Sequence, residues 1–216
     1  MLEIKQFTVN PFQENTYIVW DSGSRDAAII DCGALFPEEE RSIDAFVTEK
    51  SLNIRHIVNT HLHLDHSFGN AWASTRFGIK PVAAQADEFL IAHIRQHAVA
   101  FGLPADMVHE FRLGGYISDN DVITIGDTKM KVIATPGHTP GSVCLYCEAD
   151  GVLFAGDTLF EESIGRTDLP GGSHTDLIRS IQERLMPLPD ETKVLCGHGP
   201  ATTIGHERHY NPFIVK

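Results

Sequence analysis

The residues with the clearest chemical potential lie in the run THLHLDH at positions 60–66. Three imidazoles and one carboxylate in so short a run are side chains that bind zinc and related divalent metals. The run follows an apolar segment, 54–59, that is typical of a buried strand. If strand geometry continues past that segment, His61 and His63 point to one side, because side chains alternate with a period of two. The spacing therefore predicts that both histidines face one metal, while the acid and the last histidine of the run face a second position nearby.

Three further side chains of the same kind stand just beyond predicted strands, at His138, Asp157 and His198. Each lies in a turn that contains glycine, and a glycine lets the backbone come close to a site. One metal centre explains all these ligand-type residues more economically than separate coincidences do. The candidate ligands are His61, His63, Asp65, His66, His138, Asp157 and His198.

This pattern resembles the metallo-β-lactamase fold superfamily, whose signature is an HxHxDH run followed by a lone His, a lone Asp and a last His. The resemblance extends from about Asn15 to His198. It implies an α/β fold, the αββα sandwich of two mixed sheets with helices on the outer faces. It also implies that His61, His63 and His138 hold a first metal, that Asp65, His66 and His198 hold a second, and that Asp157 bridges both.

Two further segments, 156–160 and 163–172, resemble the glyoxalase II group of that superfamily. Members of this group hydrolyse hydroxyacyl-glutathione thioesters. Only a short tail follows His198, so the C-terminal helical domain that helps the two-domain enzymes bind glutathione is not expected. The chain therefore resembles the short glyoxalase II-like hydrolases, with one domain over residues 1–216.

The resemblance implies a hydrolase with two divalent ions, zinc in the first place and iron or manganese as alternatives. Two such ions deprotonate a shared water near neutral pH, and the bridging hydroxide attacks the thioester carbonyl. The ions also stabilise the oxyanion and the departing thiolate. Asp65 and Asp157 are the carboxylates expected to be catalytic, and the expected partner is a small thioester.

Four residues outside the ligand set are candidates to support the site. Asp31 and Asp168 are expected either to accept the outer N–H of a ligating histidine or to cap their own turns. Arg166 either orients the substrate or pairs with an acid in its own loop, and the presence of Asp168 there favours the pair. His174 follows the same loop and is a candidate to border the site.

Two other motifs are better explained by a structural role than by metal binding or redox chemistry. His93 and His97 lie one turn apart on a predicted helix, which favours a solvated or channel-facing surface over a metal pair. Cys144 and Cys147 have the spacing of a redox motif, but they lie in a predicted strand, where positions three apart point to opposite faces.

Composition limits the classes of partner. The chain has 216 residues and a formal net charge of −12 at pH 7, a field that repels phosphate backbones and anionic lipid headgroups. Nucleic acid and membranes are therefore not expected partners. Four cysteines are too few for a dense disulfide framework, and no stretch approaches the roughly 18 apolar residues of a membrane span. Residues 1–20 also lack the apolar stretch of a signal peptide, so a cytoplasmic location is expected. The oligomeric state stays open.

The alternation of apolar runs and turn signals predicts two similar halves, each with strands first and a helix later. Two such halves favour two mixed sheets packed face to face, with helices outside. The predicted strands are 4–9, 16–20, 27–30, 54–59, 122–125, 129–134, 143–147, 152–155 and 194–196, and the predicted helices are 38–50, 71–77, 87–101 and 175–185.

Other activities of the same superfamily remain as alternatives. Persulfide dioxygenases bind one iron and consume oxygen, and they share a Gly-Arg-Thr-Asp loop like residues 165–168. A lactonase needs the same hydroxide. An acid at Asp157 with no cysteine there argues against a typical β-lactamase, and the short interval to His198 leaves no room for the insertion of the nucleic-acid-cleaving branch. A non-enzymatic binding protein is the bland alternative.

Overall fold

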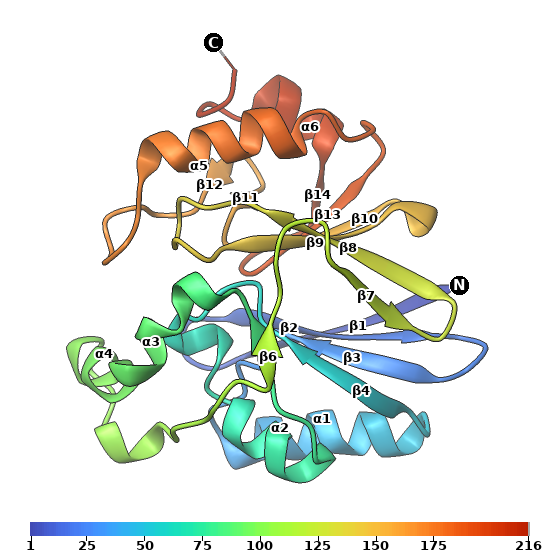
Figure 1. Ribbon diagram of the computed structural model, residues 1–216, viewed down its shortest axis with the longest axis vertical. Helices are drawn as coiled ribbons and strands as arrows, with labels where there is room; N and C mark the ends of the chain where they lie inside the picture. Colours follow the sequence, from blue (N-terminus) through green and yellow to red (C-terminus); the bar gives the residue numbers. More distant parts are fainter. Residues whose placement is uncertain (216) are drawn as a thin grey trace.

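The first half of the chain forms a mixed sheet in the lower part of the molecule (Figure 1). The computed structural model describes residues 1–215. The opening three strands are an antiparallel meander, as the sequence predicts, and the next three strands add in parallel. In spatial order they are β1 (Leu2–Val9), β2 (Glu14–Asp21), β3 (Asp26–Ile30), β4 (Asn53–Val58), β5 (Val82–Ala83) and β6 (Gly115–Tyr116).

The second half forms another mixed sheet above the first (Figure 1). Its strands are antiparallel except for one parallel pair, β10 and β13. A separate two-stranded ribbon, β11 (Leu159–Phe160) and β12 (Ser163–Ile164), lies next to it in the chain. The spatial order is β14 (Thr202–Thr203), β13 (Lys193–Cys196), β10 (Val152–Gly156), β9 (Val143–Cys147), β8 (Thr128–Ala134) and β7 (Val122–Ile125).

Helices cover the outer faces of both sheets, which completes the αββα sandwich (Figure 1). Below the first sheet lie α1 (Pro37–Glu49) and α2 (Asn70–Phe77), and beside it lie α3 (Phe89–Ala92) and α4 (Ile94–Ala100). Above the second sheet lie α5 (His174–Ser180), which continues as the π-turn Ile181–Leu185, and α6 (Ile204–Tyr210). Single 3-10 turns are formed by Leu64–His66, Gln85–Asp87, Ala105–Met107 and Glu148–Asp150.

The two sheets hold each other through an apolar layer between them. Strand alternation builds this layer: Val143, Leu145 and Cys147 of β9 face the partner sheet, and Cys144 faces the helices. The two cysteines thus lie on opposite faces, as the sequence predicts, and all four cysteines are buried and free. Burial of both faces explains why β9 and β10 are continuous apolar runs.

The predicted helix over 87–101 is wrong as a single element. The chain breaks at His93, where φ is −113° and ψ is 7°, and the His93 N–H bonds to the Leu90 carbonyl three residues back. The result is two short helices joined by a tighter turn. Leu90 and Ile94 still bury in one apolar cluster, which explains why the apolar spacing alone suggested continuity.

Parallel pairing brings the chemically interesting segments to common edges. In the first sheet Ile30 lies opposite Val58, so Asp31 and the loop 59–66 leave the sheet together. In the second sheet Phe154 lies opposite Leu195, so Asp157 and His198 also emerge side by side. Carboxyl ends of parallel neighbours meet at one edge of a sheet, which is where open α/β sheets place their sites.

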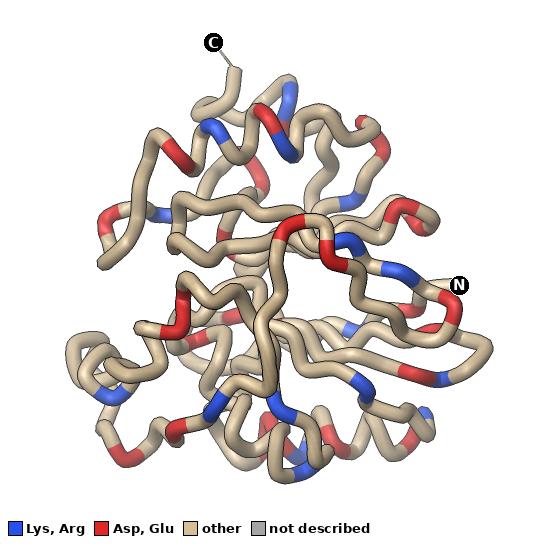
Figure 2. Tube along the Cα trace, in the orientation of Figure 1, with Lys and Arg blue, Asp and Glu red and all other residues tan. Residues whose placement is uncertain are grey.

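Charged residues are scattered along the chain rather than gathered in one basic tract (Figure 2). Lysine and arginine positions alternate with acidic ones on the outer helices and loops. Over residues 1–215, no helix combines the length and apolar composition that crossing a membrane requires.

We expect Phe154→Ala to lower the free energy of unfolding by about 3–5 kcal/mol, because it leaves a cavity between the sheets. Phe154 is 1% exposed, and its ring meets Tyr17 edge-on with centroids 5.4 Å apart. Val122→Ala on β7 is the control: Val122 is 54% exposed, so its loss should change stability by under about 0.5 kcal/mol. Denaturant titration at equal metal content measures both, and equal effects would contradict this view of the core.

Candidate metal centre

The loop 59–66 carries four of the candidate ligands and is not a strand. The expectation that strand geometry continues to His63 is wrong, because β4 ends at Val58. Instead, three hydrogen bonds from other segments hold the loop: Thr60 N–H donates to Asp31 Oδ1 (2.7 Å), Leu62 N–H to Asp87 Oδ2 (3.1 Å), and Val143 N–H to the Thr60 carbonyl (2.8 Å). Tertiary contacts, not pleat alternation, therefore aim the two histidines at one point.

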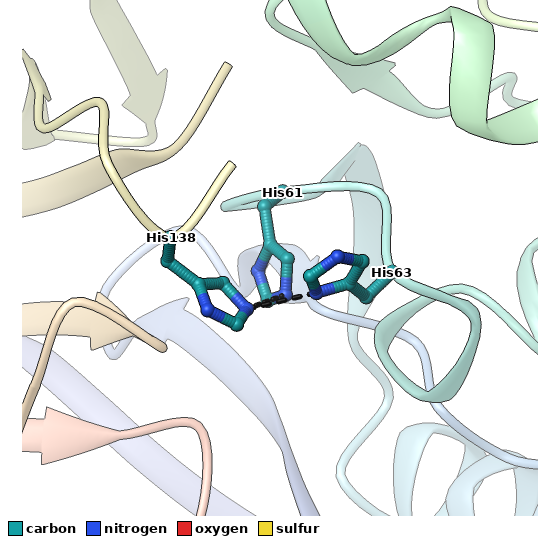
Figure 3. A group of neighbouring side chains, drawn as sticks. All are labelled: His61, His63 and His138. Atoms are coloured by element: carbon teal, nitrogen blue, oxygen red, sulfur yellow. Dashed lines mark hydrogen bonds between the residues drawn. The ribbon is translucent and has the colours of Figure 1, made fainter. Parts of the chain in front are cut away.

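His61, His63 and His138 converge on that point (Figure 3). The His138 Nε2 atom lies 2.8 Å from His63 Nδ1 and 3.2 Å from His61 Nε2. His138 comes from the turn after β8, so this cluster joins the two halves of the sandwich.

The outer ring nitrogens decide the tautomers. His138 Nδ1 lies 2.7 Å from the Arg166 carbonyl, which only accepts, so this nitrogen carries the hydrogen. His61 Nδ1 lies 3.2 Å from Thr60 Oγ1, and that hydroxyl gives its own hydrogen to Asp31 Oδ2 at 2.6 Å. With those hydrogens on the outer nitrogens, the Nε2 lone pairs of His61 and His138 face each other, an arrangement that a shared cation stabilises.

Asp65, His66 and His198 form a second cluster. His198 Nε2 lies 3.2 Å from Asp65 Oδ2 and 3.3 Å from His66 Nε2. The outer nitrogens again have acceptors: His66 Nδ1 faces Asp31 Oδ2 at 3.1 Å, and His198 Nδ1 faces the Phe12 carbonyl at 3.1 Å. The inner nitrogens are thus free to bind a metal beside a carboxylate.

Asp157 lies between the two clusters. Its Oδ2 is 3.5 Å from His138 Nε2 and 3.6 Å from His198 Nε2, one histidine of each cluster, and its Oδ1 is 3.2 Å from His66 Nε2. Oδ1 is buried and receives no hydrogen bond within the described chain, which fits an oxygen that faces a cation. This position is the one that a bridging carboxylate requires.

Glycines make room for this carboxylate. A Cβ on Gly197 would collide with Asp157 Oδ1, and one on Gly156, whose φ is +48°, would collide with Thr60. Any larger residue at either position would push the ligand loops apart.

The two clusters differ in their electrostatics. Burial, aided by the charge of His138, lowers the pKa of His63 to about 3, and burial with nearby His66 and His138 holds the pKa of His61 well below its ordinary value. Burial also disfavours charged His66, but the carboxylates of Asp157, Asp65 and Asp31 outweigh it and hold the pKa of His66 well above its ordinary value. Burial thus keeps His61 and His63 of the first cluster neutral, whereas the carboxylates around His66 in the second cluster favour its charged form.

Asp31 lies where a supporting carboxylate is needed. It is 2% exposed and adopts the left-handed backbone conformation, with φ +51°. It accepts hydrogen bonds from both the N–H and the hydroxyl of Thr60, and it also faces His66. One carboxylate thereby orients a ligand of each cluster, since Thr60 in turn contacts His61.

Asp168 and His174 were candidates to support the site, and neither contacts a ligand or lines the cavity. Asp168 receives two hydrogen bonds from Arg166, at 2.7 and 2.8 Å, and the outer nitrogen of His138 bonds instead to the Arg166 carbonyl. The loop pair was the favoured alternative for Arg166, and the geometry agrees with it. His174 is the first residue of α5 and is exposed, outside the cavity lining, because the helix turns the chain away from the site.

Glu14 and Asp87 are buried carboxyls that the sequence analysis missed. Glu14 is fully buried at the start of β2, with Oε1 3.7 Å from His66 Nδ1 and without a hydrogen bond, and burial raises its pKa well above the ordinary value. Glu14 opens the polar stretch Glu14–Thr16 at the start of β2, so no local signal sets it apart. Asp87 looked like an ordinary helix start, and nothing local distinguishes it.

Asp87 ties the two ligand loops together. Its Oδ2 accepts from Leu62 N–H at 3.1 Å and from the Thr139 hydroxyl at 2.7 Å, and its Oδ1 accepts from Gly141 N–H at 2.6 Å. The positions of His61 and His63 relative to His138 thus depend on a residue that touches none of them.

A cavity of about 350 Å³ opens onto the centre. His97 lines this cavity and His93 does not, which answers the question that the sequence left open. The remaining lining residues are Phe12, His63, Leu64, Asp65, Leu90, Phe101, His138, Asp157, Phe160, Arg166, Leu169, Pro170 and His198.

Comparison with known proteins finds matches along almost the whole chain. Residues 9–198 match the family described as the Metallo-beta-lactamase superfamily. The chain is 35% identical to Hydroxyacylglutathione hydrolase GloC of Haemophilus influenzae, covering 99% of this chain and 98% of that protein. Two solved structures at 33% identity are similar throughout. BLEG-1 B3 metallo-beta-lactamase has a TM-score of 0.89 and covers 99% of this chain and 100% of its own, and TTHA1623 in a di-iron-bound form has 0.85 and covers 97% and 99%.

We expect protein purified without chelator to carry about two divalent ions per chain, one for each cluster. His198→Ala should reduce this to about one, because the second cluster loses a ligand while the first keeps all three of its histidines. His93→Ala, an exposed histidine outside the cavity, should keep the wild-type content. Elemental analysis decides the matter, and a wild-type value that saturates at one ion contradicts the two-ion arrangement.

Asp31→Asn should weaken metal binding by about 10–100-fold, because an amide cannot accept from Thr60 and His66 as a carboxylate does. Asp168→Asn removes a carboxylate whose side chain bonds Arg166 instead, so its metal affinity should match the wild type. Competition against a chromogenic chelator measures both variants. Equal losses would show that Asp31 has no special role in orienting the ligands.

Proposed function

We propose a reaction from one premise: the chain belongs to the metallo-beta-lactamase superfamily. The protein is a metal-dependent hydrolase that cleaves a small hydroxyacyl thioester of the lactoylglutathione type. One observation carries this proposal. A single carboxylate, that of Asp157, whose side chain is 12% exposed, lies between two clusters of metal-ligand atoms at the end of an open cavity. The activity named for the Haemophilus influenzae relative supports the choice of a thioester.

The residues fit two divalent ions. The first cluster, His61, His63 and His138, offers three nitrogens. The second cluster, Asp65, His66 and His198, offers one carboxylate oxygen and two nitrogens. Histidine and carboxylate ligands suit zinc, our choice, and they also suit iron, the metal of the di-iron-bound form of TTHA1623. Ions bound here would supply Lewis acidity toward the carbonyl oxygen and the departing sulfur, and would lower the pKa of a bound water.

The chain's own residues contribute orientation and proton acceptance. The Arg166 and Phe12 carbonyls and the Asp31 carboxylate fix the ring orientation of His138, His198 and His66 before substrate arrives. Asp65 and Asp157 are the carboxylates among the described residues that line the cavity. They are placed to take the proton that the attacking water gives up.

The overall reaction balances without another co-reactant. Water adds its oxygen to the carbonyl carbon, the carbon–sulfur bond breaks, and sulfur leaves with the bonding electron pair. The products are the hydroxy acid as its carboxylate, the free thiol and one proton. A thiolate is a good leaving group, so no strong general acid is needed opposite the metal centre.

The reaction needs no macromolecular partner. We propose that the protein acts as a single domain over residues 1–216, in the cytoplasm, on a diffusible substrate. The charge of −12 supports this choice over nucleic acid, and the four unpaired, buried cysteines accord with a reducing compartment.

Asp157→Asn should lower thioester turnover by about 10³-fold or more, because it removes the charge that serves both metal positions. His66→Ala should retain a measurable remnant, since the three histidines of the first cluster remain. Thiol release from lactoylglutathione, followed with a chromogenic thiol reagent, measures both, with His93→Ala as the control.

The same preparations distinguish the related activities. Oxygen uptake with a persulfide and one bound iron would identify a dioxygenase, and turnover of a lactone or a chromogenic β-lactam without thioester cleavage would identify those hydrolases instead. Near wild-type thioesterase activity in Asp157→Asn would contradict the role given to the bridging carboxylate.

A further inference from the structure

The cavity wall away from the metal centre is mostly apolar, with His97 and Arg166 as its polar members. Its side chains come from four separate parts of the chain: the turn between β1 and β2, the 3-10 turn Leu64–His66, the α3–α4 segment with the residue that follows it, and the segments around the β11–β12 ribbon. Phe12 and Phe101 meet edge-on with centroids 5.8 Å apart, so the wall has a packed aromatic corner. The apolar lining residues are Phe12, Leu64, Leu90, Phe101, Phe160, Leu169 and Pro170.

The cavity offers few positively charged side chains that could bind the carboxylates of a substrate. Arg166 is the only lysine or arginine among the described lining residues, and its guanidinium is already engaged by Asp168 through two hydrogen bonds. Asp65 and Asp157 add negative charge at the inner end. Recognition of the two carboxylates of glutathione normally takes free Arg or Lys donors.

The cavity is also larger than a small hydroxyacyl group. A lactoyl group has three carbons and fills only a small part of about 350 Å³. When its carbonyl faces the metal centre, the remaining volume, with its apolar wall, is left for the thiol side of the thioester.

We infer that the site selects thioesters whose thiol carries an apolar chain next to the sulfur, and that Phe101 is a specificity-determining residue for that chain. The inference rests on the proposed thioester hydrolysis. An alkyl chain buries apolar surface against Phe101 and Phe12 in the ground and transition states alike, so it acts through KM. Glutathione esters lack such a chain, and the apolar wall offers no partner for their carboxylates.

The test compares lactoyl thioesters of ethanethiol, propanethiol, butanethiol and glutathione on the zinc-loaded protein. Each added methylene should raise kcat/KM about fourfold, and butanethiol should exceed ethanethiol about 15-fold, with kcat nearly constant. Phe101→Ala should reduce the ethyl-to-butyl ratio below about fourfold.

Phe89→Ala is the matched control. Phe89 is 41% exposed and Phe101 is 42% exposed, and both lie on the α3–α4 segment, but Phe89 does not line the cavity. Phe89→Ala should therefore keep the full dependence on chain length.

Calorimetric titration with ethanethiol, butanethiol and glutathione separates this inference from the proposed function. If no thioester is cleaved, yet butanethiol binds about 15-fold more tightly than ethanethiol and Phe101→Ala removes the difference, the apolar site stands and the proposed hydrolysis fails. If thioesters are cleaved with equal kcat/KM along the series, or the glutathione ester is preferred about 1,000-fold, the inference is overturned and the hydrolase remains. An equal loss of the chain-length effect in both Phe variants also overturns it.

Discussion

Ligand atoms of like polarity are held together in this protein against their own repulsion, and the rest of the site depends on that constraint. Nitrogen lone pairs of His61 and His138 face each other at 3.2 Å, and the carboxylates of Asp65 and Asp157 both lie against His198 Nε2. Bringing these ligand atoms together without cations raises the free energy of the folded state, so the packing of the two sheets must compensate for it. Metal binding to the folded state then increases the free energy of unfolding.

The sandwich meets this constraint by using parallel strand pairs on both sides of the cavity. Asp31 and the loop 59–66 leave β3 and β4 together, and Asp157 and His198 leave β10 and β13 together. Rigid strands therefore set the spacing, while the ligands sit on short loops that hydrogen bonds hold in place. Asp87 adds the cross-connection between the loops of the two halves.

The two ends of the cavity have different chemical characters and different roles. The inner end is polar and offers ligands and proton acceptors, whereas the wall formed around Phe12 and Phe101 is apolar. Chemistry and selectivity can then change separately, because the side chains of the aromatic corner do not orient the ligands. The Phe12 backbone carbonyl links the two ends, and it accepts from His198 whatever the side chain is.

The sequence by itself determined the candidate ligands, the family pattern, most of the strands and the sandwich, because period-two alternation and short-range ligand spacing are local properties. Cys144 and Cys147 were correctly placed on opposite faces for that reason. Only the tertiary structure decided the rest. The turn at His93 and the apolar lining from Phe12 and Phe101 depend on packing that no local pattern encodes, whereas the pairing of Arg166 with Asp168 was expected from their places in one loop. The roles of Glu14 and Asp87 depend likewise on which distant segments fold against them, since a carboxylate acts on whatever lies within hydrogen-bonding distance in space.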